Sequence, residues 1–349
     1  MKIIYGMLIL VPIAFALEFM HAPPTAIFAV SAVALVPLAA ILGRATEEVA
    51  LYTGPKIGAL LNATLGNAAE LIITIVALRA GLIAIVKASI AGSIIGNILI
   101  VLGLSLLLGG LRNGIQVFDA KTAGVNANMM ALAVIALSVP AVFALGSEEI
   151  RPTPQANQFI SDGLAVVLIV LYALYLLYSL RGGEPGGPPE PEHHGAKMKL
   201  PTALAILAGS TILIVFMSEF LVGAVEPTAE AWGLSELFIG VMLVPLVGNV
   251  AEHIVAVQVA IQNKMDLSLG IAVGSGLQIA LFVAPVLVLA GVVLGQPMNL
   301  IFNAYELAAL VGAAVIASLI SVDGESNWLE GALLMLVYLI LAISFFEFR

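Results

Sequence analysis

The sequence contains no cysteine, and only 10% of its 349 residues are Asp, Glu, Lys or Arg. The absence of cysteine excludes disulfides, thiolate chemistry and cysteine-ligated zinc. A soluble globular domain is about a quarter charged, so the scarcity of charge argues against a protein surrounded by water. The net charge is −9 and no basic patch is present. Nucleic acid is therefore not expected as a partner.

The sequence is rich in apolar residues. They make up 61% of the chain, and the mean hydropathy is +1.13. Runs long enough, or nearly long enough, to cross about 30 Å of hydrocarbon are separated by Gly, Pro and charged residues. We predict an all-α integral membrane protein with about eleven membrane helices, at residues 2–17, 24–42, 57–79, 83–109, 122–146, 159–180, 200–224, 233–262, 266–294, 299–321 and 325–346.

An internal repeat relates the two halves of the chain. Residues 61–110 align without a gap with residues 243–292, and twelve of the fifty aligned positions are identical. Shared Leu and Val mean little in a membrane protein, but both copies contain the motif G-N-x-A-E, and G-S follows 22 residues after its Glu. Five crossings, an odd number, separate the third expected helix from the eighth. The copies should therefore run in opposite directions, as in many secondary transporters whose substrate sites lie near the membrane midplane.

The repeat defines the expected organisation of the chain. We predict a leading membrane helix at 1–20, a first five-helix repeat at 21–180 and an inverted second repeat at 200–349. The intervening residues 181–199 are rich in Gly and Pro, which predicts a flexible linker. With the N-terminus inside, nine of the thirteen Lys and Arg residues lie on the cytoplasmic side, as the positive-inside rule favours. The linker would then be cytoplasmic.

The repeated motif places Glu70 and Glu252 near the middle of predicted membrane helices. A charge at that depth costs about 2.5–3.5 kcal/mol even on a lenient insertion scale, and two carboxylates that face each other also repel. No Lys or Arg lies at a matching depth in the sequence. Burial and like charge both disfavour the ionised carboxylate, so we expect protons and a metal cation to compete for this pair.

Further oxygen atoms lie beside the two acids. Asn67 and Asn249 each precede a Glu by three residues and therefore share its helix face. Gly66 and Gly248 allow close helix approach and are expected to break their helices, which would free main-chain carbonyls for a cation. Carboxylate, amide and carbonyl oxygens suit Ca2+, which takes six to eight oxygen ligands. Softer metals prefer Cys or several His, whereas the choice between Ca2+ and Mn2+ stays open.

Other polar residues within the apolar runs are candidates with ordinary alternatives. A serine can simply allow close helix packing, a buried amide or histidine can be satisfied by a neighbouring helix, and an acid near a helix end can be solvated. Asn97 and Gln278 are assigned to the cation site because an unpartnered amide in lipid is costly. The candidates for proton coupling or access are His253, Glu47, Glu219, Ser93 and Ser275.

Two longer stretches surround the repeated motifs. Residues 37–72 read PLAAILGRATEEVALYTGPKIGALLNATLGNAAELI, and residues 218–253 read SEFLVGAVEPTAEAWGLSELFIGVMLVPLVGNVAEH. They resemble the paired signatures of the Ca2+/H+ antiporter (cation/proton exchanger, CAX) family. Residues 92–103, 274–285 and 323–331 are similar to that family as well. The resemblance covers nearly the whole chain apart from the linker.

The resemblance implies a fold and a site. The fold has eleven helices, one leading helix followed by two inverted five-helix repeats. The family's acids that match Glu70 and Glu252 bind Ca2+ in alternation with protons, and residues that match Asn67, Asn249 and Gln278 help to form the site. The linker departs from the family, because many members have an acidic helix there, whereas this linker has three Glu residues spaced by Pro and Gly.

Together these features predict a secondary active transporter that exchanges Ca2+ for H+ by alternating access. We expect no enzymatic activity and no cofactor, with Ca2+ as the transported substrate. The expected partners are Ca2+, H+ and the lipid bilayer, and the expected location is a prokaryotic cell membrane with the N-terminus cytoplasmic. Whether copies of the chain associate is left open.

Three alternative functions make different demands on the sequence. A Na+/Ca2+ exchanger should have more polar groups beside its acids than Thr74 and Gln258. An intramembrane protease should have a catalytic motif such as H-E-x-x-H, G-x-G-D or G-x-S-x-G, and none is present. A passive channel would not accumulate Ca2+ against its gradient.

Overall fold

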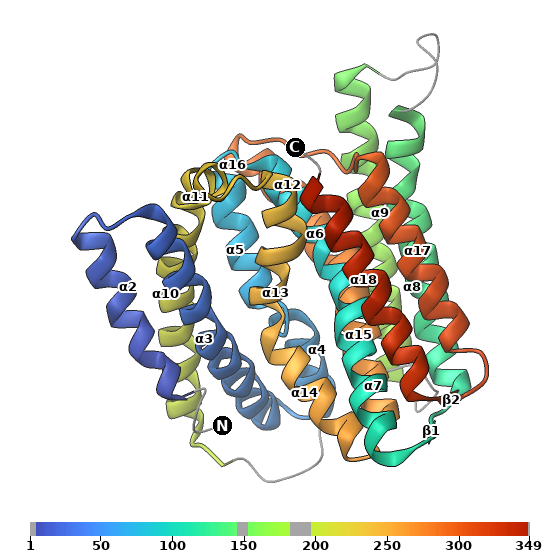
Figure 1. Ribbon diagram of the computed structural model, residues 1–349. Coiled ribbons are helices and arrows are strands. Elements are labelled where there is room, and N and C mark those ends of the chain that lie inside the picture. Colours follow the sequence, from blue (N-terminus) through green and yellow to red (C-terminus); the bar gives the residue numbers. More distant parts are fainter. Residues whose placement is uncertain (1–4, 145–152, 182–196, 348–349) are drawn as a thin grey trace. The chain divides into compact units, whose positions relative to one another are not determined.

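The computed structural model describes residues 5–144, 153–181 and 197–347, and nearly all of its regular structure is helical (Figure 1). Most of the expected linker 181–199 lies outside the described residues. The chain divides into two compact units, and each unit combines segments from both halves of the sequence. The first unit comprises residues 1–89, 190–251 and 344–349, and the second comprises residues 90–189 and 252–343.

Ten helical elements of the described residues lie mainly in the first unit. They are the 3-10 helix η1 (Met7–Ile9), α2 (Leu10–Phe19), α3 (Pro24–Thr53), α4 (Pro55–Leu65), α5 (Ala68–Arg79), α10 (Leu200–Gly223), α11 (Val225–Trp232), α12 (Glu236–Phe238), the π-helix η3 (Ile239–Leu243) and α13 (Val244–Gly248). The expected helix 24–42 is longer than predicted, because α3 continues to Thr53.

The remaining elements lie mainly in the second unit, although α6 and α14 begin in the first unit and α18 ends in it. They are α6 (Ile83–Gly96), the π-helix η2 (Asn97–Val101), α7 (Leu102–Asn113), β1 (Gln116–Val117), α8 (Ala120–Ala144), α9 (Pro154–Arg181), α14 (Val250–Ile261), α15 (Met265–Gln278), the π-helix η4 (Ile279–Val283), α16 (Ala284–Leu294), α17 (Ala304–Ile320), β2 (Glu325–Ser326) and α18 (Trp328–Glu347).

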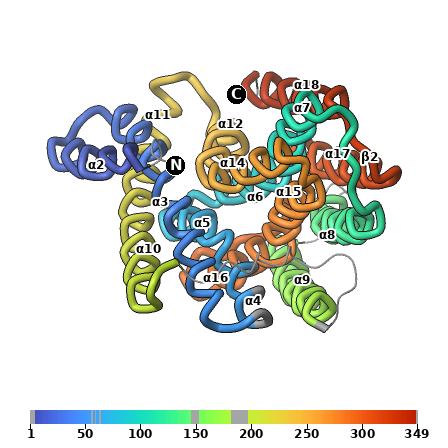
Figure 2. Tube along the Cα trace, turned by 90° about the horizontal axis from the view of Figure 1, so that it is seen from below, coloured from blue at the N-terminus to red at the C-terminus, as the bar shows by residue number. Residues whose placement is uncertain are grey.

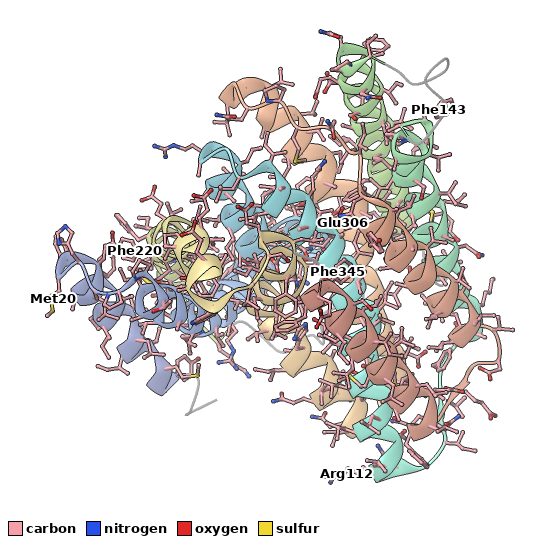
Figure 3. All side chains as sticks on the ribbon, turned by 45° about the horizontal axis from the view of Figure 1, so that its top comes forward. Met20, Arg112, Phe143, Phe220, Glu306 and Phe345 are labelled. Carbon is pink, nitrogen blue, oxygen red and sulfur yellow. The ribbon has the colours of Figure 1, made fainter. Side chains whose placement is uncertain are left out.

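The core of the first unit forms where α3 packs along α10, with α2 beside them (Figures 1 and 2). Leu35 and Leu38 of α3 and Met217 of α10 are almost fully buried in this core. Phe15 of α2 makes an edge-on ring contact with Phe220 of α10, labelled in Figure 3, at a centroid distance of 5.2 Å. Such ring pairs contribute about 0.5–1.5 kcal/mol beyond their burial.

The second unit is built on α8, which packs against both α15 and α17. Its core includes Ile94, Ile98 and Leu99, all of which are almost fully buried. The short strands β1 and β2 pair in an antiparallel register, with Gln116 opposite Ser326. This pairing ties the segment after α7 to the segment before α18.

Helix length alone does not establish eleven crossings. Among the described residues, seven helices are long and apolar enough to cross a membrane, and an eighth span results if α11 and residues 236–248, bent by 116°, count as one. Three shorter apolar helices cover Met7–Phe19, Val250–Ile261 and Ala304–Ile320. Within the described residues each expected run overlaps helical structure, but the expected spans 57–79 and 233–262 are interrupted.

The sequence repeat recurs in local structure. The π-helices η2 and η4 begin at Asn97 and Ile279, which are equivalent positions at the repeat spacing of 182 residues. Gly81, with φ 82°, and Asn263, with φ 61°, are equivalent as well. Each is a left-handed residue just after a helix, a common way to end one. The repeat therefore includes backbone irregularities at equivalent positions where the two residues differ.

A glycine substitution tests how closely α7 and α18 pack. A Cβ atom at Gly331 would lie 2.6 Å from the carbonyl oxygen of Gly103 and would also collide with the main chain of Leu107. Backbone atoms cannot swing away, so Gly331→Ala should destabilise the fold by at least about 1–3 kcal/mol. We expect a lower midpoint for thermal unfolding of the purified protein in detergent.

Gly312→Ala provides the matched control. Gly312 also lies inside a helix, but a Cβ atom there would meet nothing within 4 Å, and alanine favours the helix by up to about 1 kcal/mol. An equal change in the two variants would contradict the close packing of α7 on α18.

Candidate cation site

Both G-N-x-A-E motifs interrupt a helix, as their glycines predicted. In the first copy α4 ends at Leu65 and α5 begins at Ala68. The intervening Asn67 has φ −95° and ψ 24°, in the sparsely populated bridge region between helix and strand. The last carbonyls of α4 therefore leave the helical ladder, as at any helix end.

The second break has nearly the same backbone geometry. Helix α13 ends at Gly248 and α14 begins at Val250, with Asn249 between them at φ −91° and ψ 7°. The side-chain nitrogen of Asn249 donates to the carbonyl oxygen of Pro245 at 2.9 Å. This bond turns the amide toward the preceding helix, and the oxygen at its other end is a potential cation ligand.

Among the residues that the structure describes, Glu70 is a buried carboxylate without a hydrogen-bond partner. It lies in the first turn of α5 and is 5% exposed. Both carboxylate oxygens are shielded from solvent and make no hydrogen bond. A buried, unsatisfied polar group costs about 1–3 kcal/mol, and more when charged. Protonation or a bound cation would offset this cost.

Gly248 brings the second motif into contact with Glu70 in the first unit. A Cβ atom at Gly248 would lie 3.2 Å from Cγ and 3.4 Å from Oε1 of Glu70. The carboxylate therefore packs on the bare main chain at the second helix break. The expected close approach at Gly248 is thus a contact with the acid of the other motif.

Glu306 is a second buried acid that follows an asparagine at the same spacing as Glu70. Asn303 and Glu306 are three positions apart, and Glu306 is 3% exposed. The Asn303 side chain accepts from the Glu306 N–H at 2.9 Å, while Oε2 of Glu306 accepts from the Asn303 N–H at 2.8 Å. This capping box satisfies Glu306, whereas Asn67 makes no side-chain cap to α5.

A second set of predicted residues lies in the second unit. The side-chain nitrogen of Asn97 donates to the hydroxyl oxygen of Ser275 at 3.1 Å, so these two residues are brought together. Ser93 is buried on α6, and Gln278 is partly buried at the end of α15. Asn97 begins η2, and Gln278 immediately precedes η4. Short π-helical segments are frequent at functional sites.

Glu252 begins the second unit's part of α14. Like Glu70, it lies in the first turn of its helix, where the helix dipole favours negative charge. It is partly buried, and its neighbour His253 is 9% exposed. Each of the two acids thus occupies the same position on a short helix that follows a break.

Two of the proposed access residues lie on the surface. Glu47 is exposed near the end of α3. Glu219, near the end of α10, lies 3.8 Å from Arg79, and the two side chains are 43% and 74% exposed. An exposed pair at this separation contributes at most about 1 kcal/mol. Neither acid is part of the buried group around Glu70.

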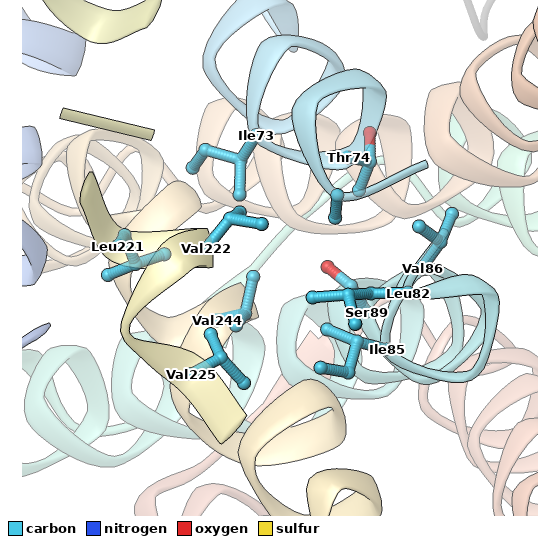
Figure 4. Close-up of a pocket in the computed structure, with 11 residues that line it drawn as sticks. Ile73, Thr74, Leu82, Ile85, Val86, Ser89, Leu221, Val222, Val225 and Val244 are labelled. Atoms are coloured by element: carbon cyan, nitrogen blue, oxygen red, sulfur yellow. The ribbon is translucent and has the colours of Figure 1, made fainter. Parts of the chain in front are cut away.

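An apolar pocket lies along α5 between Glu70 and Arg79 (Figure 4). Its space of about 10 Å³ is close to the room that one water needs. Ile73 and Thr74 of α5 line it, so apolar side chains surround this helix beyond the acid. The residues that line the other sides are Leu82, Ile85, Val86, Ser89, Leu221, Val222, Val225 and Val244, together with Ala77 of α5.

The structure adds Thr74 to the surroundings of Glu70. Its hydroxyl donates to the main-chain oxygen of Glu70 at 2.6 Å. The sequence signal was the spacing, because a threonine hydroxyl commonly bonds the carbonyl four residues earlier. This bond holds the turn that positions the acid.

Comparison with known proteins identifies the family of this chain. The sodium/calcium exchanger protein family matches residues 23–181 and 202–346. A Ca2+/H+ antiporter from Aphanothece halophytica is 47% identical, over 99% of this chain and 96% of its own length. The Ca2+/H+ antiporter ChaA of Bacillus subtilis is 43% identical, over 96% of each chain. The chain belongs to the Ca2+/H+ antiporter branch of the sodium/calcium exchanger family.

The structure of native YfkE resembles this antiporter-family chain with a TM-score of 0.86 and 40% identity, over 99% of each chain. The resemblance identified from the two motif-containing stretches is therefore confirmed. So is the fold class, an all-α multi-pass membrane protein. The assignment of individual residues to a site stays a prediction.

Gly248→Ala tests the contact between the second helix break and Glu70. The added methyl group would press on Cγ and Oε1 of Glu70 and displace the carboxylate from its position against the helix break. We expect the affinity for Ca2+, used as the probe in calorimetry, to fall about tenfold. Thermal stability should change much less, because the Glu70 side chain can shift.

Gly209→Ala is the control within the same unit, since a Cβ atom there would meet nothing within 4 Å. Unchanged Ca2+ affinity in a folded Gly248→Ala protein would contradict the prediction that Glu70 and Gly248 belong to one cation site.

Proposed function

We propose that the chain is a secondary active transporter that exchanges Ca2+ for H+ across a membrane. The observation that supports this most directly is the buried, unpartnered carboxylate of Glu70 at a helix break. The relatives named as Ca2+/H+ antiporters over nearly their full length point to the same activity. The chemistry is transport, with Ca2+ as cargo and no covalent step.

Calcium needs more oxygens than two carboxylates supply. Within the described residues no three His, Asp or Glu side chains form a metal-binding group, and Ca2+ takes six to eight ligands. We therefore propose that Glu70 and Glu252 provide the charge. Amide and main-chain oxygens complete the shell, from Asn67, Asn249, Gln278, Asn97, Gly66 and Gly248.

Coupling follows from mutually exclusive occupancy. A cation needs the carboxylates ionised, whereas protons neutralise them, so each ion displaces the other. Neutralisation by protons also removes the cost of moving an empty, charged site through an apolar environment. Alternating access between the two sides of the membrane would then exchange Ca2+ for protons. Ser93, Ser275, His253, Glu47 and Glu219 are proposed to assist proton coupling or access.

Sodium is the rival driving ion, because the matching family includes sodium/calcium exchangers. The scarcity of polar side chains after the two acids favours protons. Thr74 is the one polar residue in 71–78 and Gln258 the one in 254–260, and Gln258 is exposed. Uptake of Ca2+ driven by a pH difference in the absence of Na+ would separate the two exchangers.

The proposed location is a prokaryotic cell membrane with the N-terminus cytoplasmic. The relatives from Aphanothece halophytica and Bacillus subtilis support the prokaryotic cell membrane. The distribution of Lys and Arg in the sequence supports the cytoplasmic N-terminus. The proposed arrangement remains a leading helix and two inverted repeats joined by the linker.

Removal of either proposed charge tests the site. Glu70→Gln and Glu252→Gln keep the side-chain shape but remove the titrating group. We expect each to abolish the uptake of radioactive Ca2+ into proteoliposomes with an imposed pH gradient, at least a hundredfold, because ion and proton then have no shared group.

Glu306→Gln is the matched control, because Glu306 is equally buried but satisfied by its capping box. It should insert normally and keep transporting. Near-normal exchange in either Glu70→Gln or Glu252→Gln would contradict the assignment of these carboxylates to the cation site.

Competition between Ca2+ and protons also predicts a pH dependence with a defined sign. Binding of Ca2+ must release protons, so affinity falls as pH falls. Where both acids are mostly protonated, each displaced proton changes the affinity about tenfold per pH unit, and the slope flattens once both are ionised. Calorimetry in buffers with different ionisation enthalpies counts the released protons. Ca2+ binding without proton release between pH 5 and 8 would rule out a shared site.

A further inference from the structure

The segment that follows α7 holds the end of the helix that positions Glu252. The side-chain nitrogen of Gln116 donates to the carbonyl oxygen of Ala260 at 2.8 Å and to Oδ1 of Asn263 at 2.9 Å. The side-chain nitrogen of Asn113 donates to the carbonyl oxygens of Ala260 at 3.3 Å and Ile261 at 3.2 Å. We call Asn113 and Gln116 the α14 clasp. All of these residues belong to the second unit.

The α14 clasp completes the hydrogen bonding at this helix end. The last four carbonyls of an α-helix lack intrahelical partners. At α14 the carbonyls of Gln258 and Val259 accept main-chain bonds from the following turn, and so does Ala260. The clasp supplies further bonds to Ala260 and the bond to Ile261. The end of α14 is therefore fixed to a separate segment as well as to its own chain.

Gln116 is itself held in place. It is 1% exposed, and its Oε1 lies against Gly109, where a side chain would collide with it. Its main chain pairs with Ser326 of β2, and the Ser326 hydroxyl donates to its carbonyl oxygen at 3.4 Å. Three residues beyond Gln116 and three beyond Asn263, the Asp119 N–H donates to Oδ1 of Asp266 at 2.7 Å. A side chain fixed on several sides can hold α14 in one position.

The repeat-equivalent helix α5 has no such clasp. Gly295 and Met298 stand at the positions equivalent to Asn113 and Gln116, and neither has a side-chain amide. At the described end of α5, the carbonyls of Val76, Ala77 and Leu78 accept only main-chain bonds. The two acid-bearing helices thus share their start and their left-handed end but differ in what holds that end.

We propose that Asn113 and Gln116 are positioning residues that fix the helix of Glu252 for cation binding. This inference rests on the proposed exchange function. Glu252 and Ala260 are eight residues apart on one unbroken helix, a distance of about 12 Å along the axis. A helix this short behaves as a rigid rod, so a tilt or rotation at Ala260 displaces Glu252. Preorganised ligands lose less conformational freedom when they bind.

Gln116→Met tests the clasp with little change in volume. It removes both donated bonds, while Ala260 keeps its bonds from Asn113 and Asn263, so the protein should still fold. We expect the Ca2+ concentration for half-maximal uptake (KM) to rise about threefold to tenfold, the worth of one lost hydrogen bond, with a smaller change in maximal rate. Gln116→Glu should have a larger effect, because a carboxylate would face two acceptor oxygens. Asn113→Ala is a milder variant.

Hydrogen–deuterium exchange provides a readout that does not depend on transport. Gln116→Met should speed amide exchange in the last turn of α14 and at Asn263 and Lys264. Asn303→Ala is the matched control, because it removes a capping amide from α17 elsewhere in the same unit. That variant should speed exchange at the start of α17 and leave the KM for Ca2+ unchanged.

The outcomes separate this inference from the function it rests on. A raised KM together with faster exchange in α14, absent from Asn303→Ala, supports the clasp. An unchanged KM in both Gln116 variants overturns it, as does a raised KM with unchanged exchange in α14. The same rise in KM in Asn303→Ala would also overturn it, because the effect would then be general destabilisation. Absence of proton-driven Ca2+ uptake in the unmodified protein would instead overturn the proposed function, and this inference with it.

Discussion

A carboxylate placed where apolar side chains exclude water is costly in its ionised form, and only a proton or a cation can offset that cost when no hydrogen-bond donor or basic residue is near. Glu70 is buried, and within the described part of the chain its carboxylate oxygens have no hydrogen-bond partner. The surrounding structure keeps it so. Gly248 offers bare main chain instead of a donor side chain, and the pocket beyond Thr74 is lined mostly by apolar groups. Exchange of a proton for a cation is the chemistry that this environment favours.

The helix breaks serve the same constraint. In a bilayer every main-chain polar group must be satisfied within the protein, so irregular backbone is tolerated only where protein or a cavity surrounds it. Asn67 and Asn249 adopt nearly the same backbone angles at equivalent positions. Each break puts an acid in the first turn of the next helix, where the dipole favours negative charge. The break thus creates a position suited to a carboxylate.

The two halves are related but not interchangeable. They share breaks, π-helical segments and left-handed helix ends at the repeat spacing. They differ at the ends of the two acid-bearing helices, since amide side chains hold α14 and main-chain bonds alone end α5. The difference makes α14 the better candidate for a fixed support.

The sequence by itself determined the membrane class, the repeat and the positions of the two helix breaks. The apolar composition reflects the lipid that surrounds the chain, and the glycines of the repeated motif mark where a helix is easily interrupted. The sequence did not distinguish the Asn-x-x-Glu spacing of Asn67 and Glu70 from that of Asn303 and Glu306. Only the tertiary structure decided that Glu306 is satisfied in a capping box whereas Glu70 is not. It also decided that Glu219 lies at the surface beside Arg79 and that Gln116 bonds a carbonyl 144 residues away. Those outcomes depend on which segments meet in space, and no local pattern of residues encodes the partner of a side chain that distant in the chain.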